Sequence, residues 1–464
     1  MKMFGTNGIR GVANEYLDAD LALRMGRAIA KVLGPGPIAI ARDTRISSQM
    51  LVSAVSAGIM SMGADVVDLG MLPTPALQMF VKRAEDVTGG VMITASHNPP
   101  KFNGIKCISA DGTECSKEQE SAMEEWYEKG CETCGWDSIG CMESITGADM
   151  AYIDSILSNV NVPAIKDAKL KVCLDCANGA SVHTSPAILE MLDVEFDVIN
   201  GEPDGMFPGH ESEPTEDNLS ELKERMATGR YDLGIAHDGD ADRCVFVDRN
   251  GRYVPGDRML ALLSKRAVQF YEGGIVVTGV SSSMAVQDAV ESAGGTVDYT
   301  AVGSPIIARR MMEIDGVFGG EENGGLIFAD HQYCRDGGMA LAKVLEAVAK
   351  YGPLDEQLAE IPEYCTIKDA VMCDDAVKAT IVPKVMASVK DGRVNTLDGL
   401  RVDYDDGWVL LRPSGTEPKF RIYSESKDRA VAERRAKEFR ALVEAANRAR
   451  TRRYKVKTKR TFFK

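Results

Sequence analysis

Three aspartates at alternate positions are the residues of this chain that point most directly to chemistry. Asp238, Asp240 and Asp242 follow an apolar run, in AHDGDADRCVF. In extended backbone their carboxylates would share one side and repel one another unless a cation neutralised them. Hard oxygen donors suit Mg²⁺ or Ca²⁺, and α/β proteins assemble their sites at strand ends. The pattern predicts a divalent metal site, against the alternative of a solvated acidic turn. An EF-hand is excluded, because Arg243 stands where that loop requires glycine.

A serine and a histidine lie side by side in a second candidate loop, ITASHNPPKFNGIK, which also follows an apolar run. Ser96 beside His97 suggests hydrolase chemistry. However, neighbouring side chains on extended backbone point to opposite faces, so adjacency does not guarantee a Ser–His pair. Something else would then activate Ser96, or Ser96 would itself be modified.

Three further loops carry groups that suit a phosphorylated sugar. In RPSGTEPKFR, an arginine, backbone N–H groups and hydroxyls could form a nest for a phosphate dianion, although Pro-Ser-Gly is also ordinary turn chemistry. FGGEENGGLIF offers Glu321 and Asn323 to sugar hydroxyls on an exposed loop, and FGTNGIRG spaces Arg10 between glycines. Each of these two would be interpreted as a structural turn if it stood alone. The residues of the phosphate loop are Arg412, Ser414, Gly415 and Thr416.

Together, a metal triad and a phosphate nest favour phosphoryl transfer. A serine in such a site can carry the phosphate itself, with Mg²⁺ neutralising the charge of the phosphate oxygens. His97 would orient the loop or hydrogen-bond the phosphate. Lys106 could move a proton if burial or cationic neighbours lowered its pKa.

Alternating short β-branched runs and amphipathic stretches must position these loops, and they indicate mixed or parallel sheets in an α/β fold. A first unit has predicted strands at 37–41, 64–70 and 89–94, with helices at 47–63 and 74–84. The pattern restarts at 170–175 and again at 273–279, which predicts three units of similar plan. The last hundred residues instead predict paired strands and a long surface helix, an α+β module. The expected domains are 1–150, 151–252, 253–365 and 366–464.

Composition sets the broad class. At 464 residues, with 44% hydrophobic and 27% charged residues, the chain should form several folded domains. The net charge of −15 disfavours nucleic-acid or anionic-membrane binding. The basic tail 447–464 is interpreted as a helix end or solvated tail; the alternatives are a contact with RNA or with the acidic body of a second subunit, as in a homodimer.

Cysteine usage and targeting signals favour a cytoplasmic protein. No run of about 18 apolar residues predicts a membrane span, and the N-terminal residues lack the apolar core of a signal peptide. The eleven scattered cysteines fit a reducing compartment. The pairs Cys131/Cys134 and Cys173/Cys176 were weighed as zinc ligands, and ordinary thiols are favoured for both.

The combination of loops resembles the α-D-phosphohexomutase family. TASHNP is similar to its phosphoserine loop, DGDADR to its metal loop, GEENGG to its sugar loop and RPSGTEP to its phosphate-binding loop, in the family's order and across nearly the whole chain. The resemblance implies three α/β domains and a C-terminal α+β domain around a central cleft. It also implies a hexose phosphate substrate and one Mg²⁺ per chain.

The resemblance further implies a mechanism with named residues. Phosphorylated Ser96 would donate its phosphate to a hexose monophosphate, and the bisphosphate intermediate would return its other phosphate. A sugar 1,6-bisphosphate would act as activator. The implied roles are metal ligation for Ser96, Asp238, Asp240 and Asp242, catalysis for Ser96, His97, Lys106, Arg10 and Arg243, sugar binding for Glu321 and Asn323, and phosphate binding for Arg412, Ser414, Gly415, Thr416 and Arg421.

The sugar loop departs from many family members, which end it in histidine where this chain has Gly325. Many also carry a histidine in a preceding loop, at the place of Ser304. The GEENGG version is most similar to archaeal phosphoglucosamine mutases. We therefore expect interconversion of glucosamine 6-phosphate and glucosamine 1-phosphate, with phosphomannomutase or phosphoglucomutase activity as the alternative. A metal-dependent sugar phosphatase and a non-catalytic sugar-phosphate sensor are the rival classes.

Overall fold

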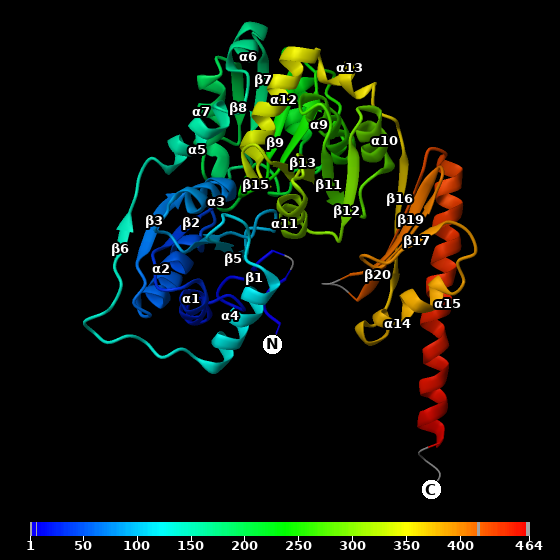
Figure 1. Ribbon diagram of the computed structural model, residues 1–464, viewed down its shortest axis with the longest axis horizontal. Helices are drawn as coiled ribbons and strands as arrows, with labels where there is room; N and C mark the ends of the chain where they lie inside the picture. Colours follow the sequence, from blue (N-terminus) through cyan, green and yellow to red (C-terminus); the bar gives the residue numbers. More distant parts are fainter. Residues whose placement is uncertain (1, 6, 415–417, 461–464) are drawn as a thin grey trace.

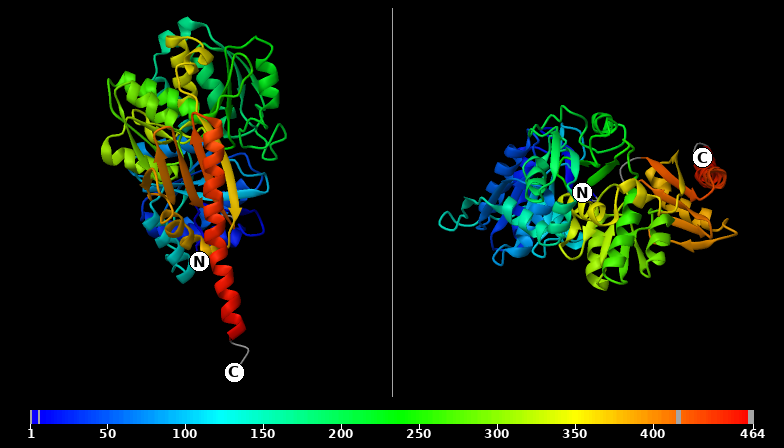
Figure 2. Two further views of the ribbon diagram at one scale, coloured as in Figure 1. Left: turned by 90° about the vertical axis from the view of Figure 1, so that its right-hand side faces the viewer. Right: turned by 90° about the horizontal axis from the view of Figure 1, so that it is seen from above.

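The computed structural model describes residues 2–5, 7–414 and 418–460, with side chains to residue 448. The chain forms four modules in sequence order, each built on one sheet. Figure 1 shows them along an arch, with the second and third modules at its top and the first and fourth at its two ends. The third and fourth modules also lie next to each other in both views of Figure 2.

The first module has a six-stranded sheet in the order β1-β5-β4-β2-β3-β6. Strands β2, β3 and β4 run parallel, and β4 forms an antiparallel hairpin with β5. The predicted elements are confirmed, within a few residues at their ends. The module's strands and helices are β1 (Ile9–Val12), α1 (Ala19–Leu33), β2 (Ile38–Arg42), α2 (Ser48–Met60), β3 (Val66–Met71), α3 (Thr74–Arg83), β4 (Gly89–Ile93), β5 (Phe102–Ser109), α4 (Lys117–Lys129) and β6 (Met142–Ser144).

The second module has a four-stranded sheet in the order β10-β9-β7-β8. Strands β7, β8 and β9 are parallel, and β9 again forms an antiparallel hairpin, here with β10. Its elements, with the helices that lead into it, are α5 (Ala148–Leu157), α6 (Val162–Ala168), β7 (Lys171–Asp175), the 3₁₀ helix η1 (Ala180–Val182), α7 (Thr184–Met191), β8 (Glu195–Ile199), α8 (Ser220–Met226), β9 (Leu233–His237) and β10 (Cys244–Asp248).

The third module repeats this plan in a five-stranded sheet, β12-β11-β13-β14-β15. Parallel β11, β12 and β13 are followed by the antiparallel hairpin of β13 and β14. Its elements are α9 (Gly256–Phe270), β11 (Ile275–Gly279), α10 (Met284–Ser292), β12 (Thr296–Thr300), α11 (Ser304–Ile314), β13 (Phe318–Gly320), β14 (Leu326–Phe328), β15 (Gln332–Arg335), α12 (Gly337–Tyr351) and α13 (Leu354–Leu358).

The fourth module differs, as predicted, because its five strands, β16-β20-β19-β18-β17, are all antiparallel. The long helix α15 packs on this sheet and continues past it to the C-terminal end (Figure 1). The elements are β16 (Cys365–Met372), α14 (Asp375–Met386), β17 (Arg393–Asn395), β18 (Leu400–Tyr404), β19 (Gly407–Pro413), β20 (Lys419–Ser426) and α15 (Arg429–Arg460).

One buried apolar cluster extends through the first three modules, while the fourth has a core of its own. In each of the first three sheets, one parallel strand (β4, β9 or β13) turns back into an antiparallel neighbour. The serine, aspartate and sugar loops identified in the sequence are the connections of these three equivalent hairpins: β4 to β5, β9 to β10 and β13 to β14. The fold therefore places one candidate loop from each module at the same topological position.

Candidate active site

The serine loop and the aspartate loop meet where the first and second modules join. The Ser96 hydroxyl donates to Asp238 Oδ2 over 2.7 Å. Both side chains are buried. A direct hydrogen bond between residues 142 positions apart confirms that the two loops form one site.

Ser96 occupies a left-handed backbone conformation, with φ of 51°. Its N–H donates to Thr94 Oγ1 over 2.8 Å, and its Oγ lies 3.3 Å from His97 Nδ1. The argument from extended backbone, which placed the serine and histidine on opposite faces, does not hold here because the chain turns at Ser96. The serine hydroxyl therefore lies between an imidazole and a carboxylate.

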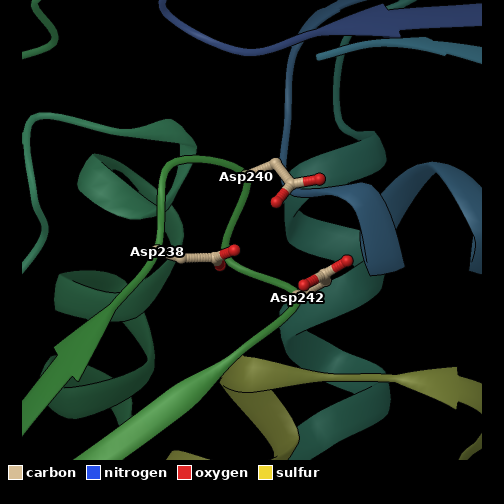
Figure 3. A group of neighbouring side chains, drawn as sticks. All are labelled: Asp238, Asp240 and Asp242. Atoms are coloured by element: carbon tan, nitrogen blue, oxygen red, sulfur yellow. The ribbon is translucent and has the colours of Figure 1, made fainter. Parts of the chain in front are cut away.

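The three aspartates converge, as predicted, but not through extended backbone. Residues 238–242 form a turn in which Ala241 N donates to Asp238 O, and Ala241 is left-handed with φ of 54°. Figure 3 shows the three carboxylates directed toward the same side of this turn. One oxygen of each lies within 4.8 Å of the others, and this is the one group of potential metal ligands in the described part of the chain.

Cationic side chains surround this acidic cluster. Lys106 Nζ lies 2.6 Å from Asp240 Oδ2 and 3.1 Å from Asp242 Oδ2. Arg335, at the end of β15, pairs with Asp242 Oδ2 over 2.5 Å. Arg243 Nε is about 4 Å from Asp238 and Asp242. These ion pairs offset the mutual repulsion of three neighbouring carboxylates in a buried site.

The pKa values of these groups follow from burial and from their neighbours. Burial, then Asp242 and Asp240, raise the pKa of Asp238 to about 8. Burial alone would lower the pKa of Lys106, but its ion pairs with Asp240 and Asp242 outweigh that effect and raise it. A lowered Lys106 pKa, the condition set from the sequence for proton acceptance, is therefore not met. In this arrangement the Lys106 ammonium stays protonated beside Asp240 and Asp242.

Arg10 and His97 lie on the edge of the same cluster. Arg10 Nη1 donates to Asn98 Oδ1 over 2.7 Å, next to the serine loop. Burial, with Arg243, Arg10 and Arg335 nearby, lowers the pKa of His97 to about 2. The imidazole is thus neutral, and it can exchange a hydrogen bond with Ser96 without adding charge.

The residues fit a divalent metal. Asp240 Oδ1 and Asp242 Oδ1 are buried carboxylate oxygens without a hydrogen-bond partner in the structure. Unpaired buried acceptors of this kind are rare in proteins. Their position beside Asp238 is the arrangement that oxygen-preferring cations such as Mg²⁺ require.

The sugar loop lies next to these charges but is less exposed than predicted. Glu321 is buried, because Arg335 Nη1 lies 3.8 Å from its carboxylate and ties it to the cluster. Burial raises the pKa of Glu321. Asn323 is only partly buried, and its Oδ1 accepts from Gly325 N over 3.0 Å, which shapes the turn. The sugar loop thus offers one buried carboxyl and one accessible amide.

The phosphate loop lies on β19 and β20 of the fourth module. Arg412 Nε pairs with Asp398 over 2.8 Å, and Ser414 N donates to Lys419 O. Arg421 stands opposite Arg412 in the β19–β20 register. The predicted residues Gly415 and Thr416 lie outside the described residues. In Figure 1 this end of the hairpin is on the side of the fourth module that faces the first.

Sequence reasoning missed Arg335 and Thr74, which both contact the triad. Arg335 stands at a strand end, like the other site residues, but no motif marked it. Thr74 opens α3 and was interpreted only as part of a helix start, yet its hydroxyl donates to Asp240 Oδ2 over 2.6 Å. All eleven cysteines are free, and within the described part of the chain none belongs to a group of three or more potential metal ligands.

Comparison with known proteins was made on the sequence and on the fold. All four modules match the phosphoglucomutase/phosphomannomutase family: alpha/beta/alpha domain I over residues 1–133, domain II over 150–251, domain III over 255–364 and the C-terminal domain over 370–442. No helix of the described residues is long and apolar enough to cross a membrane.

Relatives and a solved structure match over nearly the full length. A protein of Methanopyrus kandleri named "Probable phosphoglucosamine mutase" is 42% identical, over 95% of this chain and 96% of its own. A "Phosphoglucomutase/phosphomannomutase" of Thermococcus kodakarensis is 40% identical over 94% and 96%. The crystal structure of a phosphoglucomutase/phosphomannomutase family protein from Burkholderia thailandensis superposes with a TM-score of 0.85 at 28% identity, covering 95% of this chain and 97% of that one.

The predicted resemblance is confirmed, and with it the fold of three similar mixed α/β domains and one C-terminal α+β domain. The chain belongs to the phosphoglucomutase/phosphomannomutase family, and it is a phosphohexomutase, an isomerase acting on a hexose phosphate.

Proposed function

We propose that the chain interconverts glucosamine 6-phosphate and glucosamine 1-phosphate, with Ser96 as the phosphate carrier and a sugar 1,6-bisphosphate as intermediate and activator. One observation carries the proposal: the Ser96 hydroxyl lies 2.7 Å from one of three clustered, buried carboxylates. Such a hydroxyl can form a phosphate ester beside a site that suits a cation.

The first transfer joins a sugar hydroxyl to the phosphorus of phospho-Ser96 and breaks the bond between phosphorus and Oγ. The proton released by the sugar hydroxyl ends on Ser96 Oγ, which becomes a hydroxyl again, and neutral His97, 3.3 Å from Oγ, can hydrogen-bond that hydroxyl. In the return step, Ser96 Oγ attacks the other phosphate of the bisphosphate. Lys106, which stays protonated beside Asp240, can protonate the departing sugar oxygen.

Asp238, Asp240 and Asp242, with an oxygen of phospho-Ser96, would hold one Mg²⁺ per chain. When bound, Mg²⁺ neutralises charge on the transferring phosphoryl group. Arg10 and Arg243 add fixed positive charge beside the same group.

The fourth module would hold the phosphate that does not react. Arg412, Ser414, Gly415, Thr416 and Arg421 are the proposed groups, with Glu321 and Asn323 binding the sugar hydroxyls. Arg412 and Arg421 stand opposite each other on β19 and β20, which favours a site for a dianion. A homodimer is a further proposal, to be tested by its mass in solution.

The phosphoenzyme is tested by intact-mass analysis and by Ser96→Ala. The purified protein should carry one phosphate on Ser96 in part of the molecules, and the variant should lose several orders of magnitude in kcat while keeping its fold. The matched control is Ser53→Ala, an exposed serine on α2. Near-normal turnover by Ser96→Ala would refute the carrier role.

The choice of an amino sugar is supported by the names of the archaeal relatives and by the charge of the sugar loop. Glu322 follows Glu321 in that loop and offers a carboxylate to the ammonium at C2 of glucosamine. We expect Glu322→Gln to reduce the preference for glucosamine phosphates over glucose phosphates, measured as the ratio of kcat/KM. An unchanged ratio contradicts this role of Glu322, whereas a parent that itself prefers glucose or mannose phosphates favours the alternative, a phosphomannomutase or phosphoglucomutase.

A metal-dependent sugar phosphatase would use the same aspartates but release phosphate to water. Phosphate release and isomer formation should therefore be followed in one assay. A mutase forms isomer, depends on added sugar bisphosphate and releases little phosphate.

A further inference from the structure

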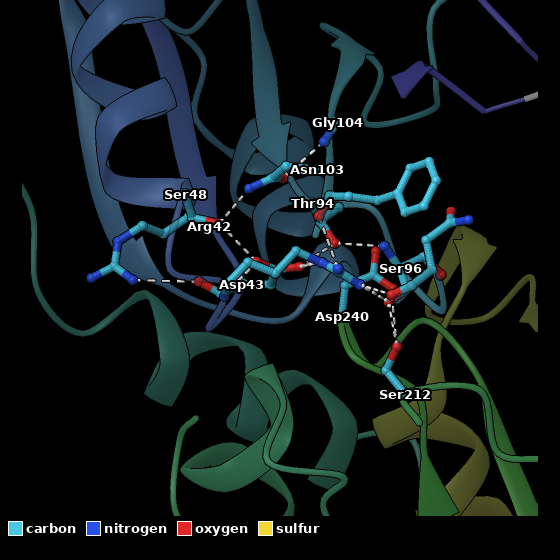
Figure 4. A network of polar contacts seen from close by, with 12 residues as sticks. Arg42, Asp43, Ser48, Thr94, Ser96, Asn103, Gly104, Ser212 and Asp240 are labelled. Carbon is cyan, nitrogen blue, oxygen red and sulfur yellow. Dashed lines mark hydrogen bonds and ion pairs between the residues drawn. The ribbon is translucent and has the colours of Figure 1, made fainter. Parts of the chain in front are cut away.

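Arg45, between β2 and α2, holds the serine loop by its backbone. The guanidinium is fully buried and donates to four carbonyl oxygens of that loop. Figure 4 shows the network in which these bonds lie. The acceptors and distances are Ser96 O at 2.8 Å, Asn98 O at 2.6 Å, Pro99 O at 2.8 Å and Phe102 O at 2.9 Å.

Asp43 connects this clamp to the other side of Ser96. Its carboxylate accepts from Arg45 Nε over 3.0 Å and from the Thr94 hydroxyl over 2.7 Å. Thr94 Oγ1 in turn accepts from Ser96 N over 2.8 Å. One buried carboxylate thus supports both the N–H and the C=O of Ser96, through a threonine and an arginine respectively.

Such support matters because of the backbone conformation of Ser96. A φ of 51° is unfavourable for a residue with a side chain, and it persists only where its surroundings impose it. The same turn directs Oγ toward Asp238. Without the clamp the loop would relax and carry the hydroxyl away from the aspartates.

The second module completes the clamp. The ring of Phe207 covers the Arg45 guanidinium at 5.0 Å, and Ser212 Oγ lies 3.2 Å from Asn98 O. Gly205 packs so closely that a Cβ there would lie 2.5 Å from Thr44 O. A Cβ on Gly239, inside the aspartate loop, would lie 2.6 Å from Ser96 O. The serine loop is therefore enclosed by two modules.

We infer that Arg45 is a positioning residue for phosphoryl transfer, which together with Asp43 fixes the Ser96 oxygen relative to the aspartates. The inference rests on the proposed role of Ser96 as phosphate carrier. Arg45 contacts neither the sugar loop nor the phosphate loop through any of these bonds. Its loss should therefore slow the transfer step and leave substrate binding nearly unchanged.

The test compares the parent, Arg45→Ala and Arg45→Lys. Single-turnover phosphorylation of Ser96 by glucose 1,6-bisphosphate is followed by intact mass, and kcat and KM are measured in steady state. Displacement of a reacting group by about 1 Å can cost about 10²-fold. We expect losses of that order in the phosphorylation rate and in kcat for both variants, with KM within threefold of the parent. Lysine should not restore the rate, because one ammonium cannot reach all four carbonyl oxygens that surround the planar guanidinium of Arg45.

Addition of millimolar methylguanidinium separates positioning from general stability. It can occupy the space left in Arg45→Ala and should restore part of the rate, whereas a merely destabilised protein would not recover. Arg42→Ala is the matched control: among the described residues, the side chain of this neighbouring, partly buried arginine makes only a 3.4 Å bond to Asp43 O, and the rates should stay within twofold.

If Arg45→Ala does not fold, Thr94→Val is the second variant, since it keeps the shape and removes only the Asp43–Thr94–Ser96 branch. A transfer rate in a folded variant within threefold of the parent overturns the inference, as does a rate loss in Arg45→Ala that methylguanidinium leaves unchanged. If the parent itself takes no phosphate on Ser96, the proposed function fails and the inference fails with it. A phosphorylated parent with an equally fast Arg45→Ala overturns the inference alone.

Discussion

At the scale of single residues, Lys106 neutralises part of the negative charge of the aspartate cluster when no metal is bound. Its ammonium is buried and paired with Oδ2 of Asp240 and of Asp242, so it neutralises part of the charge that a metal cation would also neutralise. Removing one partner of a buried ion pair typically costs about 3–5 kcal/mol, because the other charge stays buried and unpaired. The stability of a Lys106 variant should therefore depend on a metal.

We predict that Lys106→Met lowers the melting temperature in EDTA and that Mg²⁺ restores much of the loss. The shift caused by Mg²⁺ should be larger than in the parent, while kcat falls by about 10²-fold or more as the proton donor is lost. Differential scanning fluorimetry with and without Mg²⁺ measures the shift. Lys129→Met, which breaks an exposed pair with Glu125, is the control. An equal Mg²⁺ shift in Lys106→Met and the parent would contradict the idea that Lys106 and the metal neutralise the same carboxylates.

Contiguous site residues could be predicted from the sequence, and residues brought in by tertiary contact could not. Ser96 and the three aspartates stand in short motifs whose chemistry can be recognised without a structure. Arg335 and Thr74 each sit in an ordinary strand or helix start, and only the packing of modules brings them to Asp242 and Asp240. The left-handed turn at Ser96 is likewise imposed by distant partners such as Arg45, so local rules predicted extended backbone there.

At the scale of elements, the start of α2 shows that side chains expected to cap a helix can instead hold the serine loop. Ser47 occupies the N-cap position of α2, but its side chain makes no capping hydrogen bond to the helix. Its hydroxyl accepts instead from Asn103, and that of Ser48 donates to Asp43. Strand and helix locations followed from periodicity alone. The two hydroxyls, by contrast, belong to the hydrogen-bond network around the serine loop. Helix-capping preferences, which consider only neighbouring residues, do not predict that network.

Helices α1 and α2 pack against each other at two glycines, Gly26 and Gly58. A Cβ on Gly58 would lie 2.2 Å from Leu23 O and 3.0 Å from the Cα of Gly26. The backbone cannot yield as a flexible side chain would. The crossing therefore requires glycine for contact, although glycine inside a helix is intrinsically unfavourable.

We predict that Gly58→Ala destabilises the protein by about 1–3 kcal/mol, as overpacking does elsewhere, despite the higher helix propensity of alanine. Urea unfolding followed by circular dichroism gives the free energy. Ser53→Ala, on the exposed side of the same helix, should stay within about 0.5 kcal/mol of the parent. A Gly58→Ala protein as stable as the parent would show that the two helices can separate at little cost.

At the scale of the whole molecule, the fourth module is joined to the third through a mixed contact. Trp408 and Leu410 pack with Val280 in a small apolar cluster, and Arg401 donates to Val280 O over 2.5 Å. Acidic groups gather at the same junction: Glu425 of β20 accepts from Met284 N over 2.8 Å. This junction determines where the phosphate loop stands relative to the other three loops.

Asp257, in the first turn of α9, makes this junction sensitive to pH. Its carboxylate accepts from Ser283 N over 3.1 Å, and the adjacent Gly256 packs against the backbone of Glu322 in the sugar loop. Burial, then Glu322 and Glu425, raise the pKa of Asp257 to about 7. In an unfolded chain the group titrates near its ordinary value of about 3.9.

Between these two pKa values the folded protein holds a proton that the unfolded chain has released, so stability falls as the pH rises from about 4 to about 7. We predict that Asp257→Asn, which keeps the acceptor for Ser283 N, removes this part of the pH dependence. Its melting temperature should exceed that of the parent by several degrees at pH 8 and approach it below pH 5. The control is Asp20→Asn, an exposed aspartate in the first turn of α1, which should leave the profile unchanged. Parallel profiles for the parent and Asp257→Asn would mean that Asp257 is already ionised in the folded protein and that the junction of the third and fourth modules tolerates its charge.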